Sequence, residues 1–167
     1  MWNAMVIVVM GVSGAGKSTI GRALAAALGW EFHDGDDLHS EESKRKMHRG
    51  EPLTDFDRGP WIIAVRQVVQ AMLSSGTNGV VACSALKQSY RDQIVGDAAS
   101  VKLVYLKGSR RLIGERLAGR IGHFMNPELL QSQFDTLEEP DDRDAIVVDI
   151  SMAPEAIVAD IRARLGV

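Results

Sequence analysis

One stretch of the sequence matches the Walker A pattern of phosphate-binding loops at all eight positions: Gly11, Val12, Ser13, Gly14, Ala15, Gly16, Lys17 and Ser18. Its glycines allow the backbone to wrap around a phosphate, so that successive N–H groups point at the anion. In such loops the lysine reaches the β- and γ-phosphates, and the hydroxyl after it ligates Mg²⁺. We therefore expect residues 11–19, including Thr19, to bind the phosphates of a nucleoside triphosphate, with Ser18 on the metal.

Two carboxylates, Asp34 and Asp36, follow a brief strand expected at residues 30–33. Parallel sheets carry their ligand chemistry at the carboxyl ends of the strands, which places this pair on the same rim as the phosphate-binding loop. Phosphoryl transfer to an alcohol is accelerated about 10²- to 10⁴-fold by a group that accepts the hydroxyl proton. Asp34 or Asp36 is a candidate for that base. The alternative is a polar turn with a helix cap at Asp36 or Asp37.

The elements that must position these residues alternate between strand and helix. Apolar runs predict strands at residues 5–10, 80–83, 101–106 and 145–150, the first of them buried on both faces, and a brief further strand is expected at residues 30–33. Helical spacing and capping residues predict helices at residues 19–28, 40–49, 57–74, 88–95 and 109–118. A further helix is expected to begin at residue 127, and a final helix to end at residue 165. This order predicts an α/β fold of the P-loop NTPase type, a doubly wound five-stranded parallel sheet in a single domain over residues 1–167.

Composition limits the classes of function. The longest apolar run near the start, residues 5–10, is far shorter than the roughly 18 to 20 residues that cross a bilayer and lacks the flanks of a secretory signal. A net charge of −3 with interspersed signs provides no positive field for nucleic acid. The one cysteine, Cys83, is expected to be a core thiol, and the histidines lack the spacing of a zinc site. We expect a cytoplasmic protein with no membrane or nucleic-acid partner.

The class of P-loop protein follows from what the sequence lacks. Switch GTPases, ATPase motors and small-molecule kinases all share the loop, but the guanine-reading motif Asn-Lys-x-Asp or Thr-Lys-x-Asp does not occur here. A length of 167 residues is short for a motor domain with its sensor elements. The strand expected at residues 80–83 runs into Cys83 and Ser84, where many P-loop ATPases carry a metal-binding aspartate. A small kinase is therefore the leading class.

Further motifs, in order over nearly the whole chain, resemble those of the gluconate kinases, small P-loop kinases related to shikimate and adenylate kinases. They are GVSGAGKST (11–19), DGDDLH (34–39), M-x-x-GEPL-x-D-x-DR-x-PW (47–61), CSALK-x-x-YRD (83–92), YLKG (105–108), R-x-GHF (120–124) and L-x-x-QF-x-x-LE-x-P (130–140). The resemblance implies transfer of the γ-phosphate of ATP, with Mg²⁺, to the 6-hydroxyl of D-gluconate. It also makes a homodimer plausible.

Gluconate is an anion with five hydroxyls, so its pocket needs a fixed cation and several hydrogen-bonding side chains. Arg58 can grip a carboxylate through two parallel hydrogen bonds, and the alternative is an ion pair with Asp55 or Asp57. By similarity to the shikimate kinases, Asp36 is the expected base, and it is also a candidate to hold Mg²⁺ through water. The other candidates for substrate binding are His39, Asp55, Lys87, Arg91 and His123. For Lys87 and Arg91 the alternative is a solvated helix face.

Arg116 and Arg120 lie four residues apart on a predicted helix that leads into a segment resembling the mobile lid of small kinases, approximately residues 119–135. In a closed lid both would contact the ATP phosphates, and Arg120 would be catalytic by stabilising charge on the transferring phosphoryl, an effect of about 10³- to 10⁵-fold. The alternative is an exposed helix whose arginines pair with Glu115. Analogy with small kinases places the nucleoside base near residues 151–154 and Arg110 or Arg111.

Two other functions stay open at this stage. One is a P-loop kinase for another small hydroxy acid, of the shikimate type. The other is a nucleotide-dependent binding module that has lost transfer. Trp61 and Phe134 are expected to pack beneath the acceptor site and the lid in any of these proteins.

Overall fold

The computed structural model describes residues 3–96, 99–119 and 127–167. Its centre is a sheet of five strands, β1 (Val6–Met10), β2 (Glu31–Asp34), β3 (Gly79–Ala82), β4 (Val101–Lys107) and β5 (Ile146–Asp149). The strand order is β2-β3-β1-β4-β5, and every pairing is parallel. All five residues of β1 are buried, as expected for the apolar run at the middle of such a sheet. The predicted doubly wound α/β P-loop fold is confirmed.

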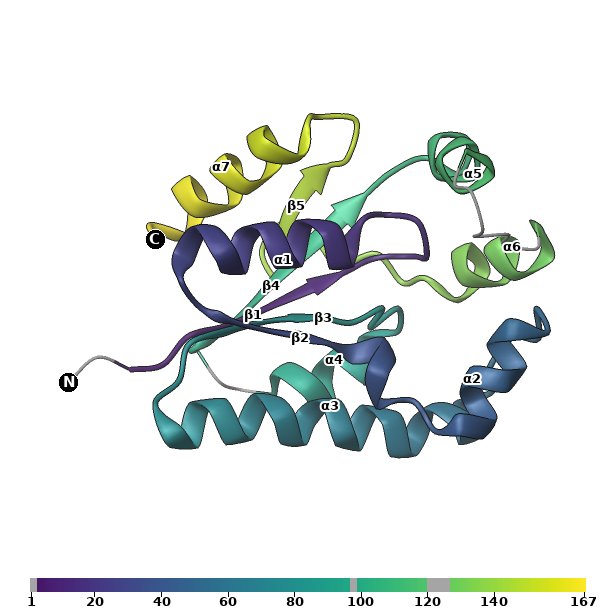
Figure 1. Ribbon diagram of the computed structural model, residues 1–167, viewed down its shortest axis with the longest axis horizontal. Coiled ribbons are helices and arrows are strands. Elements are labelled where there is room, and N and C mark those ends of the chain that lie inside the picture. The colour runs from purple at the N-terminus through teal and green to yellow at the C-terminus, as the bar shows by residue number, and fades with distance from the viewer. Residues whose placement is uncertain (1–2, 97–98, 120–126) are drawn as a thin grey trace.

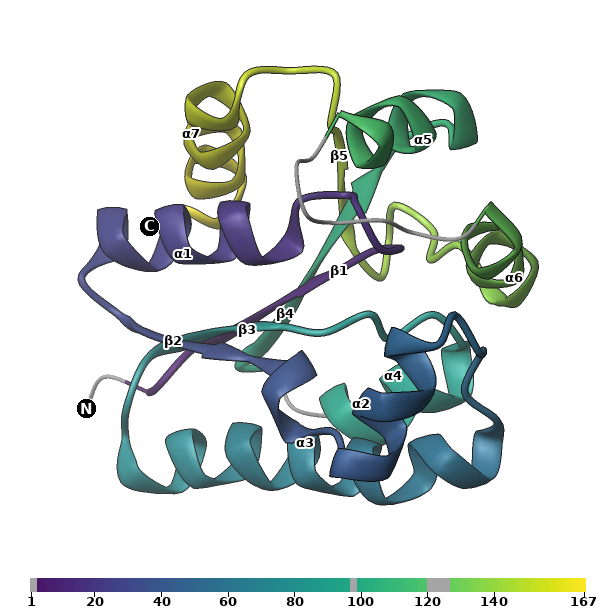
Figure 2. The same cartoon turned by 45° about the vertical axis from the view of Figure 1, so that its right-hand side comes forward.

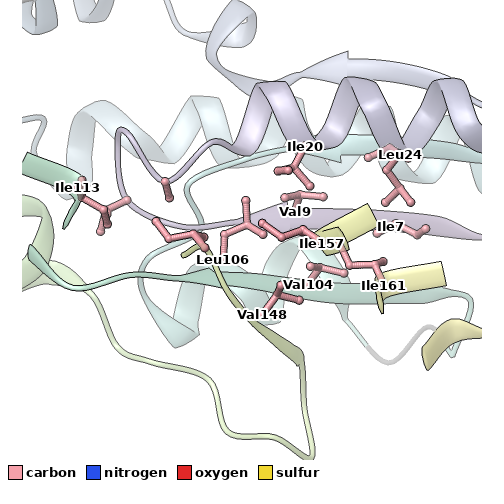
Figure 3. Packing of buried hydrophobic residues seen from close by; sticks show 14 of the residues in the cluster. Ile7, Val9, Ile20, Leu24, Val104, Leu106, Ile113, Val148, Ile157 and Ile161 are labelled. Carbon is pink, nitrogen blue, oxygen red and sulfur yellow. The ribbon is translucent and has the colours of Figure 1, made fainter. Parts of the chain in front are cut away.

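Helices cover both faces of the sheet (Figure 1). On one face, α1 (Lys17–Leu28) and α7 (Pro154–Leu165) pack against Ile7 and Val9 of β1, as Figure 3 shows. On the other face, α3 (Asp55–Ser75) and α4 (Gln88–Val95) pack against Val6 and Val8. The alternation of β1 side chains between two cores fixes the strand in register and holds the start of the phosphate-binding loop rigidly.

Three further helices lie beyond the carboxyl ends of the strands, α2 (Glu41–His48), α5 (Arg110–Ala118) and α6 (Pro127–Thr136) (Figures 1 and 2). The short 3-10 helix η1 (Gly35–Leu38) connects β2 to this end of the molecule. These elements, rather than the sheet, supply most of the walls around the site. Within the residues that the structure describes, no helix is long and apolar enough to span a membrane.

The long helix α3 begins at Asp55, two residues before the expected start, and carries Pro60 inside its first turns. The reason is a capping box: the Thr54 hydroxyl accepts the Asp57 N–H at 3.1 Å, while an Asp57 carboxylate oxygen accepts the Thr54 N–H at 2.9 Å. This exchange fixes the start of the helix upstream of Pro60. It also sets the direction in which Arg58, one turn into the helix, projects.

Candidate active site

The Walker A residues form the turn between β1 and α1, and the amino end of α1 opens toward the site. Gly14 and Gly16 have φ values of 81° and 95°, in the left-handed region that side chains disfavour. A Cβ at Gly14 would also lie 2.8 Å from Cγ of Leu117 on α5. Backbone shape and close packing therefore both require glycine here. The Lys17 ammonium donates to the Val12 carbonyl at 3.0 Å, which holds it across the loop.

Asp34 is engaged through both of its carboxylate oxygens. Oδ2 accepts the Ser18 hydroxyl at 2.7 Å, and Oδ1 accepts the Asp36 N–H at 3.0 Å, so Asp34 caps η1 while facing the P-loop. Hydroxyl and carboxylate oxygens are the donors that Mg²⁺ prefers. Among the described residues no three acidic, His or Cys side chains form a metal cage. Ser18 and Asp34 thus fit a Mg²⁺ ion held by few protein oxygens together with substrate phosphates.

A pocket lies beside the P-loop, and several separate segments of the chain line it. Its lining residues are Ser13, Lys17, Asp36, His39, Met47, Glu51, Pro52, Leu53, Arg58, Trp61, Ser84, Leu86, Leu129, Ser132 and Gln133. Five of the expected site residues meet in this pocket: Ser13, Lys17, Asp36, His39 and Arg58. Two cations therefore share a half-enclosed space with the carboxylate proposed as a base.

Arg58 both lines the pocket and contacts residues behind it. Its Nη1 donates to the Tyr90 hydroxyl at 3.4 Å, and the nearest oxygen of Asp55 is 4.0 Å away. That contact is the ion pair with Asp55 expected as the alternative, and Asp55 is also bonded by Lys87, at 2.8 and 3.0 Å, and by the Tyr90 hydroxyl. These hydrogen bonds from Lys87 and Tyr90 lower the pKa of Asp55. The Arg58 guanidinium, which carries five N–H donors, is held from one side and faces the pocket with the other.

Lys87 and Arg91 are not among the residues that line this pocket. Lys87 pairs with Asp55 behind Arg58. Arg91 is only 3% exposed, and it donates to the carbonyls of Ala85, Leu86 and Glu138 at 2.9, 3.0 and 2.7 Å. Neither substrate contact nor a solvated helix face describes Arg91, because these backbone acceptors hold its guanidinium inside the protein.

His39 and Trp61 form one wall of the pocket. Their rings are stacked, with centroids 4.4 Å apart and planes inclined by 11°. Trp61 Nε1 donates to the Gly35 carbonyl at 2.7 Å, which fixes the Trp61 ring against η1. Burial lowers the pKa of His39, which keeps its imidazole neutral at pH 7. His39 Nδ1 is buried and has no hydrogen-bond partner among the described residues.

Of the residues expected to act at the lid or on the helix that leads into it, the structure describes Arg116. Arg120 and His123 lie outside the described residues. Arg116 Nη2 donates to the Ile150 carbonyl at 2.5 Å, just before the loop expected near the nucleoside base, and Arg116 does not line the pocket. Glu115 pairs with Arg111 at 3.1 Å rather than with Arg116. Phe134 is partly buried and packs against the core on the α1 side of the sheet.

Several lining and supporting residues escaped the sequence interpretation. Gln133 Oε1 accepts the Ser13 N–H at 2.7 Å across 120 residues of sequence. Tyr90 holds Arg58 and Asp55, while Glu51 and Ser84 line the pocket. Each of the four belongs to one of the quoted motifs. The motifs include these residues, but a motif does not indicate which hydrogen-bond partners its residues have in the folded chain.

Comparison with known proteins finds close relatives over most of the chain. Residues 6–140 match a family model described as an AAA domain. A probable gluconokinase of Mus musculus is 48% identical over 152 residues, covering 81% of this chain and 83% of that protein. The thermoresistant gluconokinase of Escherichia coli is 42% identical, covering 92% of this chain and 89% of that protein.

Solved structures agree with these sequence matches. The crystal structure of a gluconokinase from Sinorhizobium meliloti superposes with a TM-score of 0.88 at 44% identity, covering 99% of this chain and 94% of that one. A shikimate kinase from Aquifex aeolicus superposes with a TM-score of 0.64 at 15% identity, covering 97% and 96%. At that identity the shikimate kinase shares the fold alone.

Proposed function

The chain belongs to the gluconokinase family, and on that premise we propose that it transfers the γ-phosphate of ATP to the 6-hydroxyl of D-gluconate, giving 6-phospho-D-gluconate and ADP. One observation carries the proposal: Arg58, a cation suited to a carboxylate, shares a pocket with the P-loop lysine Lys17 and the free carboxylate of Asp36. An acid at one end of the substrate and a reacting hydroxyl at the other would occupy the two ends of that pocket.

Substrate recognition would follow from the chemistry of the walls. The Arg58 guanidinium provides parallel N–H donors that match the two oxygens of a carboxylate. His39 and Glu51 line the pocket and would provide polar groups for the hydroxyls of gluconate, with the Glu51 carboxylate also paired with Arg49. The Trp61 ring under His39 gives a rigid apolar floor for the carbon skeleton. Together these side chains favour a linear polyhydroxy acid.

For the transfer step, Asp36 is the better candidate for the base. Asp34 is engaged through both oxygens, whereas Asp36 lines the pocket. Asp36 would take the proton of the 6-hydroxyl as its oxygen bonds to the γ-phosphorus and the bond from that phosphorus to ADP breaks. Lys17 and the N–H groups of residues 14–18 would stabilise the charge on the transferring phosphoryl. When bound at Ser18, Mg²⁺ would supply further neutralisation of the phosphate charge.

The direct test is release of ADP with ATP and Mg²⁺ in the presence of D-gluconate, of shikimate, or of no acceptor. We expect release that depends on gluconate, with little on shikimate. The Lys17→Ala protein is the control for contaminating kinases, and it should be folded and inactive. Release with shikimate alone would favour the hydroxy-acid kinase of another type. ATP binding without release with either acid would favour the binding module.

We further infer that the remaining expectations from the sequence and the resemblance hold for this chain: a single domain over residues 1–167, a homodimer, a cytoplasmic location, and lid roles for Arg120 and His123. The identity of more than 40% to several gluconokinases over most of the chain supports carrying them over. Light scattering on the eluting peak of a sizing column tests the dimer. A mass of one chain at assay concentration would overturn it.

A further inference from the structure

Helix α6 is fastened to the P-loop side of the molecule by apolar contacts and by one polar contact. Leu130 is 6% exposed and belongs to the same buried cluster as Val12 and Ala15 of the loop. One turn later, Gln133 Oε1 accepts the Ser13 N–H at 2.7 Å. The helix that carries these residues also contributes Leu129 and Ser132 to the pocket wall. The acceptor pocket and the phosphate-binding loop thus share a direct connection.

The Ser13 contact is made by a group of known orientation. A backbone N–H can only donate, so the carboxamide must turn its oxygen to Ser13 and its NH₂ away. Gln133 itself lines the pocket with Lys17 and Asp36. Its side chain therefore joins a donor of the P-loop to the space in which the acceptor would bind.

We propose that Gln133 is a positioning residue that couples occupancy of the P-loop to the shape of the acceptor pocket. This inference rests on the proposed function and goes beyond it. Phosphates bound on the N–H groups of residues 14–18 hold the loop, and with it the neighbouring Ser13, in one conformation. Through the Ser13–Gln133 hydrogen bond the same phosphates hold α6, and with it Leu129 and Ser132, against the acid. Each substrate then binds more tightly in the presence of the other, by the same factor.

The test measures the dissociation constant of D-gluconate by calorimetry, with and without saturating non-hydrolysable ATP analogue and Mg²⁺. In the unaltered protein the analogue should tighten gluconate binding by about 5-fold or more, the usual range of such coupling. In Gln133→Leu, which keeps the volume and removes the acceptor, the ratio should fall close to one. Because Gln133 lines the pocket, its loss can also change gluconate affinity without nucleotide, so the readout is the ratio of the two dissociation constants and not either one alone. The Tm should change little.

Gln131→Leu is the matched control, because Gln131 lies on the same helix, bonds Asp135 at 2.6 Å and does not line the pocket. It should retain the coupling. Gln133→Ala provides a second variant if the leucine lowers the Tm. Undiminished coupling in both Gln133 variants, or an analogue that weakens or does not affect gluconate binding in the unaltered protein, overturns the proposal. Absence of any gluconate binding would instead refute the proposed function.

Discussion

Asp34 and Asp36 are two residues apart, yet their contacts assign them different work. The two carboxylate oxygens of Asp34 accept hydrogen bonds from the Ser18 hydroxyl and the Asp36 N–H, while Asp36 lines the pocket. We expect Asp36→Asn to lower kcat about 10²-fold or more, with the KM for ATP little changed, because the amide cannot accept the hydroxyl proton. Asp34→Asn should instead raise the Mg²⁺ concentration needed for half-maximal rate. Steady-state kinetics would refute the assignment if Asp36→Asn turned over near the normal rate.

Tyr90 is a residue whose effect should appear at the substrate although it does not line the pocket. Its hydroxyl accepts from Arg58 and donates to Asp55. Tyr90→Phe removes one hydrogen bond on the guanidinium, so the KM for gluconate should rise about 2- to 10-fold with kcat nearly unchanged. Tyr105→Phe is the control, since the Tyr105 hydroxyl bonds Glu139 instead. An equal KM in Tyr90→Phe and the unaltered protein would mean that Tyr90 does not position Arg58.

His39 gives stability a dependence on pH. Burial lowers its pKa, so between that value and the ordinary pKa near 6.5 the unfolded chain binds more protons than the folded one. Stability contributed by neutral His39 is therefore present above the unfolded pKa and is lost as pH falls through the folded pKa. Denaturant titrations from about pH 7 to 5 should show a steeper loss in the unaltered protein than in His39→Asn. Matching slopes would remove His39 as the cause.

Among the structural elements, the turn that binds phosphate could be predicted from the sequence, whereas the exact ends of the helices could not. The glycines, lysine and serine of the P-loop are adjacent in the chain, so their pattern predicted the turn between β1 and α1. Pro60 favours a helix entry near Asp57, but the Thr54–Asp57 capping box outweighs it and α3 begins two residues earlier, at Asp55. The burial of Arg91 could not be read from its helix alone, because one of its backbone acceptors, Glu138, lies 47 residues away in the sequence.

Thr54 connects helix capping to substrate binding. Thr54→Ala removes the hydroxyl that accepts the Asp57 N–H, which should cost about 1 kcal/mol of unfolding free energy. Because Arg58 lies on the first turn of the same helix, the KM for gluconate should also rise. Ser109→Ala, which removes the equivalent cap of α5, should lose similar stability and leave that KM unchanged. A rise of KM in both variants would point to general loosening instead of local misplacement of Arg58.

For the whole molecule, the alternation of apolar runs with helical patterns was enough to predict five parallel strands and their flanking helices. The pocket was harder, because it is assembled from contacts between residues far apart in sequence. Gln133 meets Ser13 across 120 residues, and Arg58 meets Tyr90 across 32. Spacing along one chain fixes residues on the same helix or loop, but it does not say which loops meet. The motifs of the family resemblance contain these residues, but only the folded structure shows which hydrogen-bond partners they have.

The proposed transfer to the 6-hydroxyl depends most on one arrangement of gluconate in the pocket. Its carboxylate binds Arg58, and its far hydroxyl lies at Asp36 and the P-loop. The position of phosphorus in the product tests that arrangement directly. Phosphorus-31 NMR of the reaction with D-gluconate and ATP should show one new phosphomonoester signal coupled to the two protons on carbon 6. Phosphate on any other carbon, or no phosphorylated gluconate from a folded protein that binds ATP, would contradict the account.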